Sequence, residues 1–85
     1  MPHRAVFTKA FLRGRRKLSD EVARRVVEAV KEILTDPYVG APLSEPLKGF
    51  WRARVGDYRI IYEVDAGGNR VVFHSVGHRR QIYER

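Results

Sequence analysis

The chain has 85 residues and no cysteine, and its 17 Lys and Arg against 10 Asp and Glu give a formal net charge of +7. This length predicts one domain over residues 1–85, and the missing cysteine excludes disulfides, thiolate metal sites and thiol nucleophiles. The charge favours a polyanionic partner such as nucleic acid. The alternative is a soluble protein whose basic surface has no such partner. No N-terminal apolar stretch resembles a signal peptide or a membrane span, so we expect a cytoplasmic protein without a membrane partner.

The first half of the chain predicts a short strand followed by two helices. Residues 4–7 form the expected strand, and Thr8 can cap a helix from Lys9 to about Leu18. Ser19 is the expected N-cap of a second helix, in which apolar residues recur at the 3.6-residue spacing of a core-facing stripe until about Thr35. Three prolines then fall within residues 36–49, which we expect to form a loop that crosses to a sheet.

The second half predicts three antiparallel strands. Their expected ranges are 50–55, 58–64 and 70–76, separated by a Gly56–Asp57 turn and a loop over residues 65–69. Residues 77–83 are expected to form a polar, basic tail. The element order predicts an α+β fold: a short N-terminal strand, a two-helix hairpin, and an antiparallel β-meander packed on the helices.

Arginines dominate one face of the expected hairpin. If Gly56–Asp57 is a two-residue loop, Arg54 faces Arg59 and Arg52 faces Ile61, so three arginines share one patch. Like charges directly opposite each other destabilise a sheet by up to about 1 kcal/mol, which an anionic ligand would explain. The alternative is a basic sheet face covered by an acidic partner protein. Fixed guanidinium groups can stabilise the charge that develops on phosphoryl oxygens when an RNA 2′-hydroxyl attacks its phosphate.

Proton transfer, metals and nucleotides have weaker signals. His78, in the polar tail, is the preferred proton carrier, whereas His74 is expected to be a packed or half-exposed strand residue on the same face as Val72 and Val76. Three scattered histidines and no cysteine argue against a metal site. Residues 67–69 are read as a hairpin loop and not a phosphate cradle, so we expect no cofactor and no small-molecule ligand.

Two segments resemble the RelE/ParE toxin superfamily: Leu47–Tyr62 (LKGFWRARVGDYRIIY) and Val76–Tyr83 (VGHRRQIY). The GDYRIIY hairpin and the V-x-H-R motif are the most specific marks of that resemblance. It implies the toxin of a type II toxin–antitoxin system with a RelB-like antitoxin as partner. In the RelE branch it further implies a ribosome-dependent, metal-independent endoribonuclease that cleaves mRNA in the A site by 2′-hydroxyl attack.

The resemblance also implies roles for individual residues. Phosphate binding and transition-state stabilisation fall to Arg52, Arg54 and Arg59. Arg79 would stabilise the scissile phosphate, and Tyr83 would stack on or orient the substrate. His78 stands where some relatives have lysine, so the general acid stays open. Because these four arginines and Tyr83 are all present, the resemblance favours the ribonuclease. The alternatives are a ParE-like DNA gyrase inhibitor and an inactive homologue that binds only an antitoxin.

Overall fold

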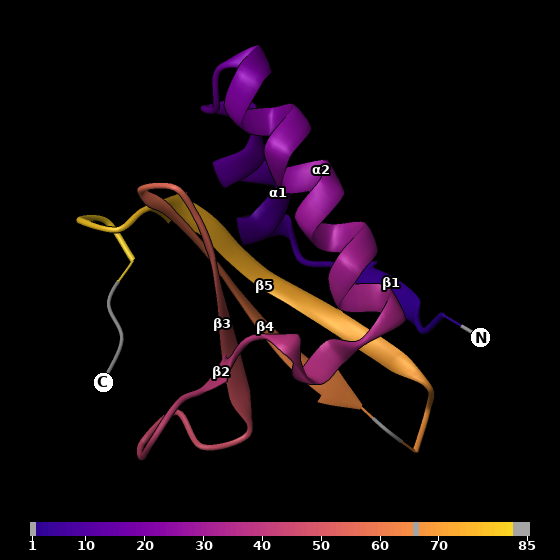
Figure 1. The fold of residues 1–85 in the computed structure, drawn as a ribbon. Helices are drawn as coiled ribbons and strands as arrows, with labels where there is room; N and C mark the ends of the chain where they lie inside the picture. Colours follow the sequence, from indigo (N-terminus) through magenta and orange to yellow (C-terminus); the bar gives the residue numbers. More distant parts are fainter. Residues whose placement is uncertain (1, 66, 83–85) are drawn as a thin grey trace.

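Two helices lie on one face of a five-stranded sheet in the computed structural model, which describes residues 2–65 and 67–82 (Figure 1). The elements in chain order are β1 (Arg4–Phe7), α1 (Lys9–Arg16), α2 (Asp20–Thr35), the 3-10 turn η1 (Pro37–Val39), β2 (Ala41–Pro42), β3 (Phe50–Val55), β4 (Tyr58–Asp65) and β5 (Arg70–His78). The strand order is β1-β5-β4-β3-β2, with β1 parallel to β5 and the other neighbours antiparallel. The predicted α+β architecture is confirmed.

Both helices begin at the predicted caps. The Thr8 hydroxyl accepts a hydrogen bond from the Phe11 amide at 3.1 Å, and the Ser19 hydroxyl accepts one from the Val22 amide at 3.3 Å. Each bond satisfies one amide that has no partner within the first helical turn. Because α1 ends at Arg16, it is shorter than predicted.

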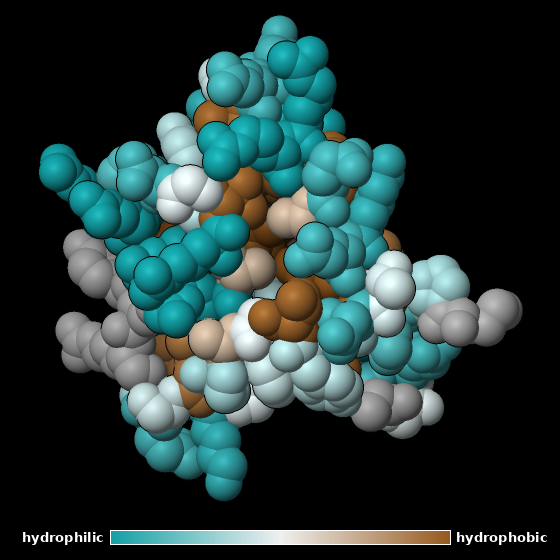
Figure 2. Space-filling view, viewed as in Figure 1, coloured by the Kyte–Doolittle hydropathy of each residue, from teal (hydrophilic) through white to brown (hydrophobic). Residues whose placement is uncertain are grey.

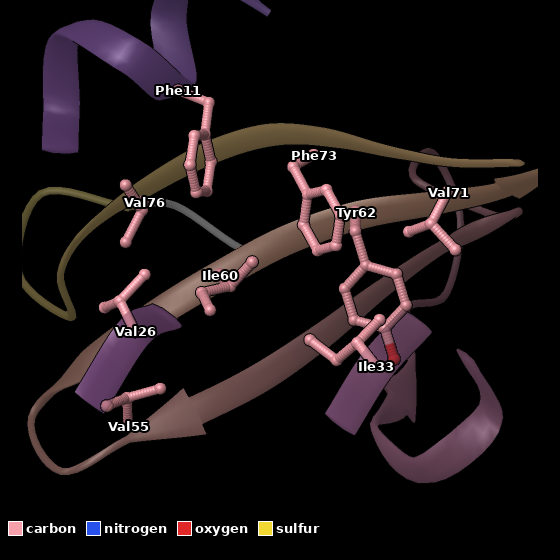
Figure 3. Packing of buried hydrophobic residues seen from close by; sticks show 9 residues of the cluster. All are labelled: Phe11, Val26, Ile33, Val55, Ile60, Tyr62, Val71, Phe73 and Val76. Atoms are coloured by element: carbon pink, nitrogen blue, oxygen red, sulfur yellow. The ribbon is translucent and has the colours of Figure 1, made fainter. Parts of the chain in front are cut away.

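The hydrophobic core fills the space between the helices and the sheet. Its buried residues come from both helices and from the helix-facing side of β3, β4 and β5: Phe11, Val26, Ile33, Val55, Ile60, Tyr62, Val71, Phe73 and Val76 (Figure 3). Apolar side chains are visible between α2 and the sheet, with hydrophilic ones around them (Figure 2). The predicted stripe of the second helix is therefore confirmed by Val26 and Ile33.

Two residues show how closely the layers meet. A Cβ atom at Gly14 would overlap the Val76 carbonyl oxygen, so only glycine lets α1 approach β5 this closely. Tyr62 is fully buried, and its hydroxyl donates a 2.7 Å hydrogen bond to the Pro37 carbonyl. Burial raises the pKa of Tyr62 above its ordinary value, so the phenol stays a donor.

Several predicted boundaries were wrong. Residues 36–49 are not all loop, because they contain η1 and the two-residue β2, which pairs Ala41 with Arg52 and Pro42 with Trp51. The strand β4 continues to Asp65, and β5 continues to His78. Gly77 and His78 therefore belong to the sheet and not to the tail.

Candidate nucleic-acid interface

The hairpin of β3 and β4 has the predicted register. Val55 pairs with Tyr58, Arg54 with Arg59 and Arg52 with Ile61. Val55 and Ile60 point into the core, and successive side chains of a strand alternate between its faces. Arg52, Arg54 and Arg59 therefore leave the sheet on the side opposite the helices, which we call the arginine face.

Arg54 is the most open of these three arginines. Its side chain is exposed, whereas Arg52 and Arg59 are half-buried. Within residues 2–65 and 67–82, Arg54 forms no ion pair, and it lines a surface pocket together with Glu28 and Glu32 of α2. An exposed guanidinium beside a second, partly desolvated one makes a site suited to the oxygens of a phosphate.

The end of β5 brings a fourth arginine to the hairpin turn. The amide of Arg79 donates a 2.8 Å hydrogen bond to the carbonyl of Asp57, and Gly77 pairs with Arg59. The exposed Arg79 therefore starts at the same end of the sheet as Arg54 and Arg59.

A tight turn follows β5 and fixes the direction of the tail. The amides of Gln81 and Ile82 both donate to the His78 carbonyl, at 2.8 and 3.2 Å. Ile82 folds back over Gly77, where its Cδ1 would lie 3.2 Å from an added Cβ. Ile82 thus anchors this turn to the end of β5. Tyr83, the remaining predicted site residue, lies outside the described residues.

His78 is not brought together with the arginines. It pairs with Tyr58, whose ring it meets edge-on at 5.4 Å between centroids, and it lines a cavity of about 550 Å³ beside Arg13 of α1 and Lys17, which caps that helix. This places its side chain on the helix-facing side of the sheet. Its Nδ1 accepts a 3.2 Å hydrogen bond from the Arg80 amide, which leaves the ring proton on Nε2. The bond also supports the turn after β5.

His74 is the half-exposed strand residue that was expected, but a β-bulge in β5 places it on a different face from Val76. The register shifts opposite Ile61 and Tyr62, so both His74 and Ser75 fall between the core residues Phe73 and Val76. Strict alternation would have placed His74 on the same face as Val76, but Val76 lies in the core while His74 lies on the arginine face.

Two other residues missed by the sequence reasoning accompany His74. Its Nε2 lies 3.1 Å from a carboxylate oxygen of Glu63, and its ring centroid lies 4.8 Å from that of Phe50. One signal could have found the cluster: the apolar core residues of this strand, Val71, Phe73 and Val76, are spaced first two positions apart and then three. That change of spacing marks the bulge.

Neither a metal centre nor a membrane span emerges from the described ranges. Among residues 2–65 and 67–82, no three His, Asp or Glu side chains gather closely enough to hold a metal ion. No helix within those same ranges has the length and apolar character needed to cross a membrane.

Comparisons with known proteins give the family of the chain. The sequence model of a family described as "ParE toxin of type II toxin-antitoxin system, parDE" matches residues 5–83. The chain is 38% identical to Toxin RelG of Mycobacterium tuberculosis over 87 residues, with all of both chains covered. It is 33% identical to Toxin RelE of the same organism, covering 96% of this chain and 87% of that one.

Solved structures show the same fold. The crystal structure of the toxin–antitoxin complex RelBE2 from M. tuberculosis matches with a TM-score of 0.86 and 34% identity, covering 93% of each chain. The isolated E. coli RelE toxin matches with a TM-score of 0.78 at 23% identity, covering 89% of this chain and 83% of that one. The chain therefore belongs to the RelE/ParE superfamily of toxins of type II toxin–antitoxin systems.

Proposed function

We propose that this toxin is a ribosome-dependent endoribonuclease that cleaves mRNA in the A site without a metal ion. The observation that carries the proposal is the cross-strand pair of Arg54 and Arg59, with Arg79 held at the same end of the sheet by its bond to Asp57. Three arginines whose backbones lie at one end of the sheet, on β3, on β4 and just after β5, suit a phosphoryl group better than they suit the stability of the sheet.

The reaction needs few groups from the protein. The 2′-oxygen of one nucleotide attacks the adjacent phosphorus, the bond from phosphorus to the 5′-oxygen breaks, and the products are a 2′,3′-cyclic phosphate and a free 5′-hydroxyl. The 2′-hydroxyl loses a proton and the leaving oxygen gains one. Arg54, Arg59 and Arg79 would stabilise the negative charge that grows on the phosphoryl oxygens, and Arg52 would hold a neighbouring phosphate.

Proton carriers are a separate part of the proposal. Tyr83 would stack on or orient the substrate, and His78 stays the predicted proton carrier through Nε2, because its Nδ1 already accepts the Arg80 amide. Since His78 faces the helix side of the sheet, it would have to act from beyond the end of β5. An effect of His78→Gln on the pH profile of cleavage would support this role, and an unchanged profile would exclude it.

The partner of the toxin would be a RelB-like antitoxin. The similar RelBE2 structure is described as a toxin–antitoxin complex, and this chain presents partly exposed apolar side chains along β1, α1 and α2 at Phe7, Leu12 and Val27. Such side chains supply area that a partner can bury, and the charge of +7 favours an acidic one. Co-expression with the antitoxin of the similar RelBE2 complex, followed by co-purification, tests this partner.

Primer extension on a reporter mRNA in a translating extract tests the activity. We expect cuts within codons that disappear when ribosomes are omitted. Intact mRNA with a folded toxin would contradict the proposal. Because the matching family is described as ParE toxin, DNA gyrase supercoiling should then be measured: inhibition would support a ParE-like function, and no effect would leave a homologue that only binds an antitoxin.

A further inference from the structure

Phe50, Glu63 and His74 form a cluster on the arginine face beside the proposed phosphate site. Phe50 pairs with Glu63 across β3 and β4, and Arg52, two residues further along β3, pairs with Ile61. An antiparallel strand rises about 3.4 Å per residue, so the cluster lies about 7 Å from Arg52 along the strand. That offset is close to the length of one nucleotide in an extended RNA strand.

The cluster offers aromatic surface that the core does not use. Phe50 does not belong to the buried core cluster, although its neighbour Trp51 packs against that cluster. The rings of Phe50 and His74 meet at 4.8 Å with a tilt of 44°, and the His74 side chain is 33% exposed. Two half-exposed rings on the arginine face present surface on which a planar base can stack.

Glu63 fixes the orientation of the His74 ring. Its carboxylate lies 3.1 Å from Nε2 and its side chain is 45% exposed, so the pair is accessible to water. A pair this exposed adds little to folding stability. With neutral histidine, Nε2 donates to Glu63 and Nδ1 is left as an acceptor toward a ligand. We assign Glu63 a positioning role.

We propose that Phe50 and His74, held by Glu63, form a subsite for one unpaired nucleobase of the RNA whose phosphates lie on the arginine face. This inference rests on the proposed function, because it requires single-stranded RNA at Arg52. Proteins that bind single-stranded nucleic acid combine a basic track for the phosphates with aromatic side chains for the bases, and the sheet provides both within neighbouring cross-strand rows.

The test measures the binding of fluorescent hexaribonucleotides that carry 2′-O-methyl groups and therefore cannot be cleaved. Oligonucleotides with one abasic position, scanned along the chain, keep every phosphate and remove one base. Stacking of one base changes affinity by about 5- to 150-fold, so we expect the wild type to lose that much at one abasic position. Phe50→Leu, which keeps apolar volume, and His74→Ala should abolish this difference while binding the abasic oligonucleotide like the wild type.

Two sets of control variants test whether the affinity difference between intact and abasic oligonucleotides comes from the proposed subsite. Tyr38→Ala removes an aromatic ring that is 54% exposed and packs edge-on against Trp51, away from the arginine face, so the difference should persist. Glu63→Gln keeps an acceptor for His74 and should retain the difference, whereas Glu63→Ala should reduce it.

The outcomes distinguish the subsite from the proposed function. A difference that survives in both Phe50→Leu and His74→Ala would overturn the subsite, and so would a wild type that binds intact and abasic oligonucleotides equally. If the wild type nevertheless cuts mRNA in the translating extract, the ribonuclease proposal stands and the subsite alone fails. A folded wild type that neither binds the oligonucleotides nor cleaves mRNA would reject both the subsite and the ribonuclease proposal.

Discussion

Arg54 and Arg59 occupy directly opposed positions on β3 and β4, so two cationic side chains share one cross-strand site. A pair of like charges in this position is destabilising, by up to about 1 kcal/mol. Val55 and Ile60, their neighbours along the two strands, are buried in the core and fix the faces on which both arginines emerge. The opposition is therefore imposed by the fold, and an anionic ligand would relieve it.

Arg54→Gln should separate stability from activity. Removing one of the two opposed charges should leave the free energy of unfolding unchanged or raise it by up to about 1 kcal/mol. Cleavage should fall by about 100- to 1,000-fold, the loss typical of removing one donor to a developing oxyanion. Urea unfolding and cleavage on programmed ribosomes measure the two effects. Arg15→Gln, which removes an exposed arginine of α1, is the charge-matched control and should cleave far better.

Arg79→Ala should reduce cleavage with little effect on folding. The side chain is exposed, and the contact to Asp57 is made by the backbone amide, which alanine retains. We expect a loss of about 100-fold or more in the single-turnover rate, because the guanidinium would act on the transition state. The adjacent exposed Arg80 provides the comparison. Equal losses in Arg79→Ala and Arg80→Ala would indicate general charge attraction and not a specific role.

Gly14→Ala should destabilise the protein although alanine is the better helix former. Helix propensity alone predicts a gain of about 1 kcal/mol. The new Cβ would overlap the Val76 carbonyl oxygen, so α1 would have to move away from β5, at a cost of about 1–3 kcal/mol. Thermal melting measures the net effect. Gly67→Ala is the control, because its Cβ would meet only an Asp65 oxygen at 3.8 Å. A raised melting temperature in Gly14→Ala would contradict the packing of α1.

Val26→Ala should lower the free energy of unfolding by about 1–3 kcal/mol through a cavity in the core. Val26 is 1% exposed, whereas Val27 on the same helix is 37% exposed. Val27→Ala should therefore cost much less. Denaturant unfolding of the two variants provides the comparison, and equal midpoints would show that the core residues of α2 are misassigned.

Asp65 should make a small contribution to stability that depends on pH. The Arg70 guanidinium, 2.6 Å from its carboxylate, and the Gly68 amide lower the pKa of Asp65 below its ordinary value of 3.8. A lowered folded-state pKa stabilises the fold above the unfolded-state value, and this stabilisation is lost as the pH falls through the folded-state value. Asp65→Asn should thus unfold more easily at about pH 7 and should match the wild type well below pH 3.8. If the unfolding midpoints of wild type and Asp65→Asn differed equally at the two pH values, the ionised Asp65 carboxylate would not be the source of the stabilisation.

Local rules in the sequence predict much of the fold. Thr8 and Ser19 mark the helix starts because a side-chain oxygen followed by a helical pattern satisfies free amides. The Gly56–Asp57 turn fixes the hairpin register, and with it the pairing of Arg54 and Arg59, because a two-residue loop allows one register only.

Features that depend on distant partners could not be predicted in this way. The strand β2 has only two residues, too few for periodicity, and forms because β3 lies beside it. The bulge that moves His74 to the arginine face depends on how β5 pairs with β4. A prediction that assumes strict alternation of side chains along the strand cannot detect it. His78 was placed in a tail because β5 appeared to end at Val76, whereas pairing with Tyr58 extends the strand and turns His78 toward the helices.

The most direct test of the central claim is the identity of the mRNA ends produced on programmed ribosomes. Purified wild-type toxin is mixed with ribosomes that hold a defined codon in an empty A site, and the 3′ ends of the fragments are analysed by mass spectrometry. The account predicts one cut within that codon, ending in a 2′,3′-cyclic phosphate. Intact mRNA, or a cut ending in a 3′-hydroxyl, would contradict cleavage by 2′-hydroxyl attack at the arginine face.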